Sequence, residues 1–170
     1  SSQAEAYTKA VNARSQNTEL EYPEFAIYPD TQAPQILPID YIEPQVGNEL
    51  AFGLDFLSEP NYRSTANLAR DTNLPAATAP ITLDQEAGGQ MAFLLMLPIY
   101  DGSVEGATVE ELRESFAGVV YAELRMDDLI NATFGANAAE QVVIGDADSG
   151  QLMFGNDPQA RWKTSDTSDE

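Results

Sequence analysis

Residues 91–100, MAFLLMLPIY, constrain the fold of this chain more than any other stretch. They are apolar at nearly every position, which is typical of a β-strand buried on both faces. Residues 76–83 alternate small and branched side chains and predict a second strand. The connection from residue 83 to residue 91 is too short for a crossover helix, so we expect this pair to be antiparallel.

Helices and strands alternate along the rest of the chain. Thr108 and Glu111 form a capping box that predicts a helix over residues 108–115. The other predicted helices are residues 4–16, 58–71 and 126–134, and a single helical turn is expected at residues 48–52. Further strands are predicted at residues 25–28, 36–42 and 118–124, with a hairpin formed by residues 141–145 and 151–154. The fold class is therefore mixed α/β (α+β) with an antiparallel sheet.

Charge and composition limit the function. The 170 residues carry 28 acidic against 8 basic side chains, a net charge of −20, which disfavours binding to nucleic acid or to anionic lipid. There is no cysteine and no histidine, so the chain lacks the usual thiol nucleophile, general base and commonest metal ligands. No stretch reaches the roughly 18 apolar residues that span a bilayer.

Neither catalysis nor metal binding has a strong signal. Paired acids such as Asp127 and Asp128 are common on so acidic a chain, and no base or nucleophile accompanies them. We therefore expect no enzymatic activity and no cofactor. The DADSG segment at residues 146–150 fails the spacing of an EF-hand loop and predicts a hairpin turn instead.

An ordered set of short motifs runs along the chain. The set begins with PIDYIEP at residues 38–44, Asn48, GLD at residues 53–55 and Ser58. It continues with ARDTN at residues 69–73, Thr78, Leu83, QE at residues 85–86, PIY at residues 98–100 and RMDDL at residues 125–129. In this order the motifs resemble the CHASE family, the extracytoplasmic ligand-sensing domain of receptor histidine kinases and nucleotide cyclases. The resemblance covers about residues 20–150.

The resemblance implies two PAS-like lobes, each a curved antiparallel sheet with helices on one side. Residues 1–117 would form the membrane-distal, ligand-binding lobe. Residues 118–160 would form part of a membrane-proximal lobe, and residues 161–170 an acidic tail.

The implied function is small-molecule sensing by a transmembrane receptor of the histidine kinase or the diguanylate cyclase/phosphodiesterase type. The chain would be the periplasmic or extracellular portion of such a receptor. The implied ligand is adenine-like or cytokinin-like, or another metabolite. The full-length receptor would be a homodimer, whereas the isolated chain can be monomeric. The alternative left open is an acidic extracellular protein-interaction module with no small-molecule ligand.

Seven residues are candidates for the ligand site. By motif, the resemblance to plant cytokinin receptors places an acidic anchor at Asp55 and a backbone contact at Ala77. Tyr41 could form one wall of the pocket. Thr78 and the inward row Phe93, Leu95 and Leu97, which share one strand face, could line the other side. For Asp55 the alternative is a turn cap that accepts backbone N–H groups, and for Leu95 and Leu97 it is core packing.

Overall fold

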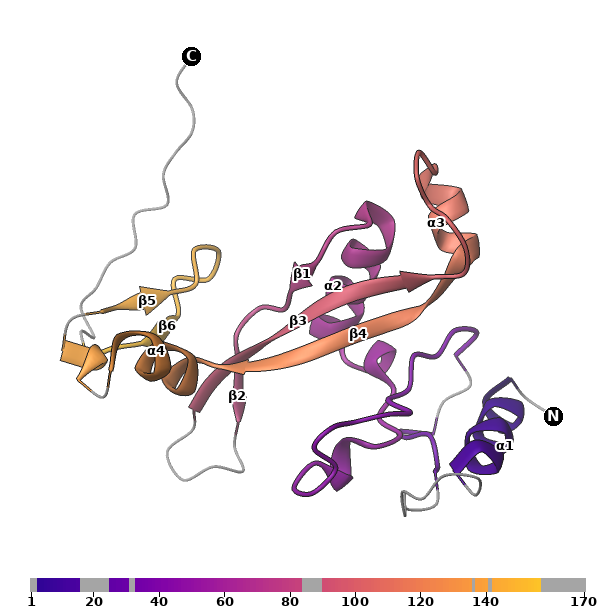
Figure 1. Cartoon of the computed structure of the whole chain (residues 1–170), viewed down its shortest axis with the longest axis horizontal. Helices are drawn as coiled ribbons and strands as arrows, with labels where there is room; N and C mark the ends of the chain where they lie inside the picture. Colours follow the sequence, from indigo (N-terminus) through magenta and orange to yellow (C-terminus); the bar gives the residue numbers. More distant parts are fainter. Residues whose placement is uncertain are drawn as a thin grey trace. The chain divides into compact units, whose positions relative to one another are not determined.

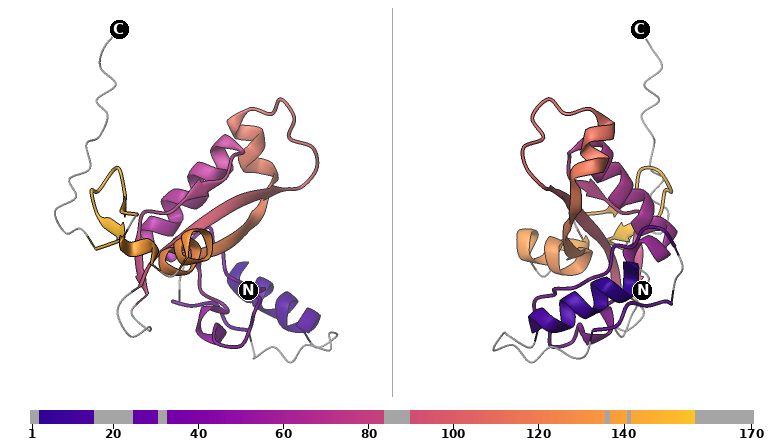
Figure 2. Two further views of the ribbon diagram at one scale, coloured as in Figure 1. Left: turned by 60° about the vertical axis from the view of Figure 1, so that its left-hand side comes forward. Right: turned by 90° about the vertical axis from the view of Figure 1, so that its right-hand side faces the viewer.

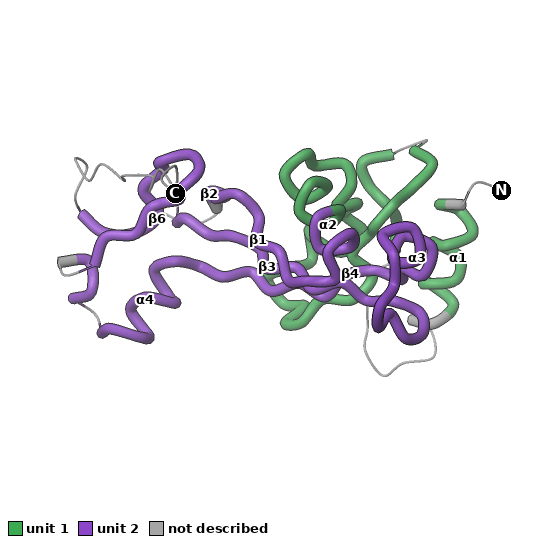
Figure 3. The backbone as a smooth tube through the Cα atoms, turned by 90° about the horizontal axis from the view of Figure 1, so that it is seen from above, with its two compact units in different colours: residues 1–67 green, residues 68–170 purple. Residues whose placement is uncertain are grey.

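The structure, a computed structural model, describes residues 3–15, 25–30, 33–83, 90–135, 137–140 and 142–156. The chain divides into two compact units, residues 1–67 and residues 68–170 (Figure 3). The boundary between them falls within one helix. The division into lobes at residue 117 stays a prediction, and the expected tail lies outside the described residues.

Unit 1 is built on helix α1 (Gln3–Ser15) and an aromatic core. Val11, Phe25 and Phe52 are buried together, and the rings of Phe25 and Phe52 meet edge to face at 5.2 Å. The amide of Asn12 donates to the carbonyl of Phe25 (3.0 Å) and accepts from its N–H (2.8 Å). The Asn12 side chain thereby pairs with the backbone of Phe25 as a neighbouring strand would, which ties α1 to this core residue. Figure 2 shows α1 as the indigo helix near the N-terminus.

The two strands expected in unit 1 are absent from its described residues. Only isolated bridges occur there, from Tyr28 to Leu54 and from Pro38 to Asp55. Pro38 carries no amide hydrogen, so residues 36–42 cannot donate a regular ladder of hydrogen bonds, and Pro29 prevents residues 25–28 from continuing one. The predicted strands at residues 25–28 and 36–42 were therefore wrong.

Short helices follow in unit 1. The predicted single turn is a 3-10 helix, η1 (Glu49–Ala51), and a second, η2 (Phe56–Ser58), comes directly after Asp55. Helix α2 (Pro60–Thr72) then begins at a proline, which the first turn of a helix tolerates. Asn73 adopts a left-handed conformation (φ 53°) just after α2, as its residue type favours.

Unit 2 holds a four-stranded antiparallel sheet (Figure 1). Strand β3 (Gln90–Tyr100) lies between β4 (Phe116–Arg125) on one side and, on the other, β1 (Ala76–Ala77) and β2 (Ile81–Leu83). The predicted antiparallel pairing and fold class are confirmed.

The edge strand predicted over residues 76–83 is broken into β1 and β2. Pro80 cannot donate to the ladder, and Pro75 lies directly before β1. At the break, the Thr78 N–H donates to the carbonyl of Leu94 (2.9 Å) and the Thr78 hydroxyl accepts from the N–H of Leu94 (3.0 Å). The hydroxyl thus replaces a backbone carbonyl of the ladder.

The far end of the sheet packs on a second cluster. Helix α4 (Met126–Phe134), helix η3 (Ala138–Glu140) and the hairpin of β5 (Ile144–Gly145) and β6 (Leu152–Phe154) form it. Its buried members are Met126, Ile130, Ala138 and Phe154.

Helix α3 (Val109–Ser115) lies between β3 and β4 in the chain, and its predicted capping box of Thr108 and Glu111 is confirmed.

Candidate ligand-binding site

One face of the sheet in unit 2 is apolar and open to solvent. The register places Leu95 opposite both Ala77 and Ala122, and Leu97 opposite Val120. Directly paired residues share a face, so these side chains form a continuous surface. We call it the outward face, and it comprises Ala77, Leu95, Leu97, Ile99, Val120 and Ala122.

Large side chains of the outward face are exposed. Leu95 is 38% exposed, Leu97 50%, Ile99 43% and Val120 57%. The solvated face of an antiparallel sheet ordinarily carries polar side chains, so this composition is unusual. Contiguous exposed apolar surface of this kind typically marks a site that binds another molecule.

The alternate row of β3 is the buried one. Ala92, Leu94 and Met96 are at most 4% exposed. The expectation that β3 is buried on both faces, with Leu95 and Leu97 in an inward row, was therefore wrong. Every position of the segment is apolar, so hydrophobicity alone could not distinguish the two rows.

Charged side chains of β4 lie on the face opposite to the outward face. Glu123 pairs with Leu94 and Arg125 with Ala92, which both belong to the buried row. The two charged groups form an ion pair with each other at 3.1 Å. The outward face as defined therefore carries no charged side chain.

Ala77 lies at the edge of the sheet with an exposed side chain. Thr78 occupies a hydrogen-bonded position opposite Leu94, so Ala77 occupies the neighbouring, non-hydrogen-bonded position. In an antiparallel ladder the N–H and C=O of such a residue point away from the partner strand. The peptide groups of Ala77 therefore point away from β3, at the rim of the outward face.

Two other predicted site residues of unit 2 have structural roles. Thr78 is 7% exposed, and its hydroxyl completes the ladder with Leu94. Phe93 belongs to the same row as Leu95 but packs against the cluster that contains Met126 and Phe154. Any contact of Thr78 or Phe93 with a ligand stays a prediction.

Asp55 lies in unit 1 and is 1% exposed. Its Oδ1 accepts hydrogen bonds from the N–H groups of Leu37 (2.8 Å) and Leu57 (3.0 Å), so it caps η2 and ties two loops together. This is the turn-capping role that the sequence left open. A further contact with a ligand stays a prediction.

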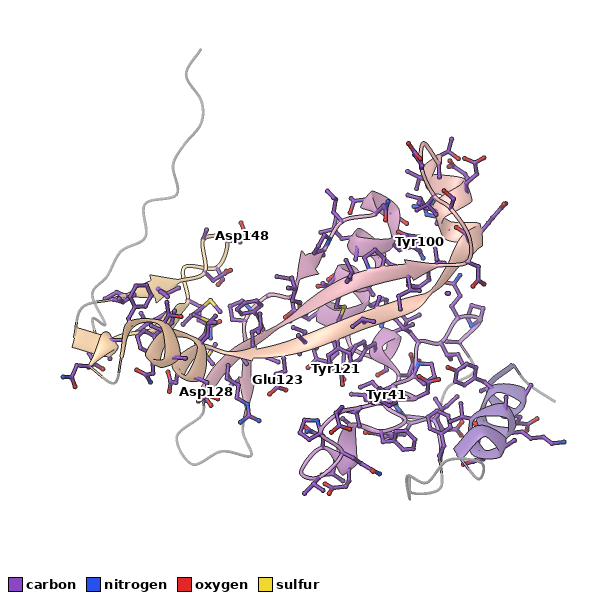
Figure 4. The ribbon with its side chains drawn as sticks, viewed as in Figure 1. Tyr41, Tyr100, Tyr121, Glu123, Asp128 and Asp148 are labelled. Atoms are coloured by element: carbon purple, nitrogen blue, oxygen red, sulfur yellow. The ribbon has the colours of Figure 1, made fainter. Side chains whose placement is uncertain are left out.

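Tyr41, which is labelled in Figure 4, also lies in unit 1. The residue is 61% exposed. Its place in a ligand site stays a prediction too.

Ile99, Val120 and Ala122 were not among the predicted site residues. The alternation that made Leu95 and Leu97 candidates extends to Ile99, which also belongs to the PIY motif. Val120 and Ala122 join the face through the register of β3 with β4, which is a non-local property.

No group of three or more acidic side chains suited to a metal ion occurs in the part of the chain that the structure describes. In the 146–150 segment, Asp146 Oδ1 accepts from the N–H (2.7 Å) and the hydroxyl (2.5 Å) of Ser149. These bonds lower the pKa of Asp146. The strands on either side pair antiparallel, so the predicted hairpin is confirmed.

A comparison with protein families decides the assignment. The sequence profile of the CHASE domain matches residues 1–154 of the 170-residue chain. The chain belongs to the CHASE domain family. CHASE domains are extracytoplasmic sensory domains of membrane receptors. No curated protein matches the chain. Among its described residues, no helix is both long and apolar enough to cross a membrane.

Proposed function

We propose that this CHASE domain senses a small organic molecule for a transmembrane receptor and binds it on the outward face of the sheet. The observation that carries the proposal is the exposed, charge-free row of Leu95, Leu97 and Val120 in a protein whose net charge is −20. Small-molecule sites are mostly apolar with a few placed polar groups. Here the peptide groups of Ala77 would supply the polar contact at the rim.

The ligand proposed is an adenine-like base or another largely uncharged metabolite. A charged ligand would lose its hydration on this face without gaining an ion pair. A planar base presents donors and acceptors along one edge, which matches the N–H and C=O of a single residue such as Ala77. The receptor's output, a histidine kinase or a cyclic-dinucleotide enzyme, would lie elsewhere in the full-length protein.

A thermal-shift screen of the purified chain tests the proposal. The panel contains purines, cytokinins, amino acids and divalent cations. A ligand present at a hundredfold its dissociation constant stabilises the native state by about 2.7 kcal/mol, which raises the melting temperature by several degrees. We expect a shift from a purine-type or other uncharged compound.

Three substitutions locate the site of any compound that binds. Leu97→Gln on the outward face should abolish the shift, whereas Leu50→Gln, at a 77% exposed leucine of unit 1, should leave it unchanged. Loss of the shift in Tyr121→Ala, on the opposite face, but not in Leu97→Gln would contradict the placement. If no compound in the panel raises the melting temperature, the result would favour the protein-interaction alternative.

Separate variants test whether Asp55 and Tyr41 contact a ligand. Asp55→Asn keeps an oxygen that can accept from Leu37 and Leu57 but removes the charge. If Asp55 anchors a ligand amine, Asp55→Asn should weaken binding without lowering the melting temperature of the free protein by more than a few degrees. Tyr41→Phe tests the Tyr41 hydroxyl in the same assay.

A further inference from the structure

Helix α3, strand β4 and helix α4 follow one another without a connecting residue. Helix α3 ends at Ser115 and β4 begins at Phe116, and β4 ends at Arg125 just before α4 begins at Met126. Connections between elements are usually a few residues long and absorb relative motion. Figure 1 shows α3, β4 and α4 in direct succession. Because no residue separates them, a displacement of α3 can pass directly into β4 and then into α4.

A polar and aromatic cluster holds the α3 end of this segment. Asp71 accepts from the guanidinium groups of Arg113 (2.5 and 3.0 Å) and Arg70 (2.7 Å). The Tyr100 hydroxyl donates to the carbonyl of Arg70 (2.5 Å), and its ring meets that of Phe116 at 6.1 Å. We call this the Asp71 cluster. It joins the end of α2, the end of β3, α3 and the start of β4.

The α4 end belongs to a different core. Met126 and Ile130 are buried in the cluster with Ala138 and Phe154. The N-terminal part of β3, through Met91 and Phe93, packs against the same cluster. The two clusters therefore lie at opposite ends of the β3–β4 pair, as Figure 1 shows.

The strand pair between the clusters has a regular register. Pairing runs without interruption from Ala92 with Arg125 to Ile99 with Gly118, and the one shift falls at Tyr100. A β4 strand of 10 residues spans about 33 Å. An unbroken ladder of this length resists local bending more than a loop does, because each bend strains hydrogen bonds on both strands.

We propose that the α3–β4–α4 segment is a conformational relay, which carries a change at the Asp71 cluster to the α4 cluster. A domain that reports a bound molecule must connect the region that senses it to a distant region. Apart from Ala77 on β1, the outward face lies on the same two strands, between the two clusters. The relay's biological purpose rests on the proposed sensing function, but the coupling itself can be measured without a ligand.

Hydrogen exchange followed by mass spectrometry on the whole chain tests the relay. Asp71→Asn weakens the Asp71 cluster, and Arg113→Gln is a second variant that weakens it from the other side. Each should raise amide exchange in Met126–Phe134 about threefold or more, together with exchange in Phe116–Arg125. The matched control is Glu114→Gln, which removes an exposed carboxylate next to Arg113 on α3 and should leave α4 unchanged.

An insertion tests the direct connection. Two glycines placed between Arg125 and Met126 should abolish the response of α4 to Asp71→Asn while the response of β4 remains. Faster exchange in β4 with no change in α4 of the uninterrupted chain would overturn the relay. An α4 response that survives the insertion, or a uniform rise that includes Gln3–Ser15, would overturn it as well, because both indicate a different or global opening. None of these results depends on whether the thermal-shift screen finds a ligand.

Discussion

At the scale of single residues, polar side chains of this domain repeatedly take the place of backbone groups. The buried polar residues identified in the described part of the chain, Asp55, Thr65 and Thr78, all hydrogen-bond to the main chain. Asn12 does the same for Phe25. Where a loop or a broken strand leaves a backbone group without a partner, the group must be satisfied, because an unpaired buried polar group is costly.

Thr78→Val should show how much the completed ladder contributes. Valine keeps the branched shape but leaves the N–H of Leu94 without its acceptor. We expect the free energy of unfolding to fall by about 1–3 kcal/mol, measured by urea denaturation. Thr78→Ser retains the hydroxyl and should recover most of the loss. Equal stability of the valine variant and the native protein would contradict this role of the hydroxyl.

Gly53 offers a test of close backbone approach. Its φ is +93°, and a Cβ atom there would overlap the carbonyl oxygen of Ala26. Gly53→Ala should therefore destabilise unit 1 by more than about 3 kcal/mol. Gly47, with φ +88° and no atom within 4 Å of the place that a Cβ would take, is the matched control. Gly47→Ala should cost only about 1 kcal/mol in the same thermal or urea unfolding measurement.

At the scale of elements, local signals predicted the helices well and the strands only in part. The capping box of Thr108 and Glu111 acts within one turn, so the sequence alone located the start of α3. Strand formation at Tyr28 and Pro38 depends on partners distant in the chain and on amide hydrogens that prolines lack. The outward face could be predicted only in part for the same reason, because Val120 reaches Leu97 through the register of two strands.

The Asp71 cluster, which joins four elements, should make stability depend on pH. The side-chain hydrogen bonds from Arg113 and Arg70 hold the pKa of Asp71 well below its usual range. A group whose pKa is lower in the folded than in the unfolded chain stabilises fully above the unfolded pKa, and that stabilisation is lost as the pH falls toward the folded value.

Asp71→Asn should therefore lower the free energy of unfolding at pH 7 by about 1–2 kcal/mol, a modest value because Arg113 is half exposed. The difference from the native protein should shrink as the pH falls below about 5. Urea denaturation at several pH values measures this difference in the free energy of unfolding, with Glu114→Gln as the control. A difference that stays constant down to about pH 3 would contradict the ionic origin.

At the scale of the whole molecule, the net charge of −20 dominates the electrostatic interactions. So many like charges repel one another, which favours solubility and opposes compactness. The ion pairs of Arg70, Arg113 and Arg125 offset only a small part of this repulsion, since basic side chains number 8 against 28 acidic ones.

Salt should accordingly stabilise the domain. Raising sodium chloride from about 0.1 to 1 M shortens the screening length from about 10 to 3 Å, so the melting temperature should rise by several degrees. Replacing the exposed Asp101, Glu105, Glu114 and Asp148 by their amides changes the net charge from −20 to −16. This replacement should reduce the rise in melting temperature that salt produces. A melting temperature that falls with salt would indicate that attractive ion pairs outweigh the repulsion.

Pro75 and Pro80, which bound the broken edge of the sheet, have a consequence for the molecule in a crowded compartment. A free sheet edge recruits strands from other molecules and can seed fibrils. The edge formed by β1 and β2 offers only short runs of amide donors, because Pro75 and Pro80 have none. This edge therefore offers neighbouring molecules no continuous template for fibre growth, although the apolar outward face beside it is exposed for binding.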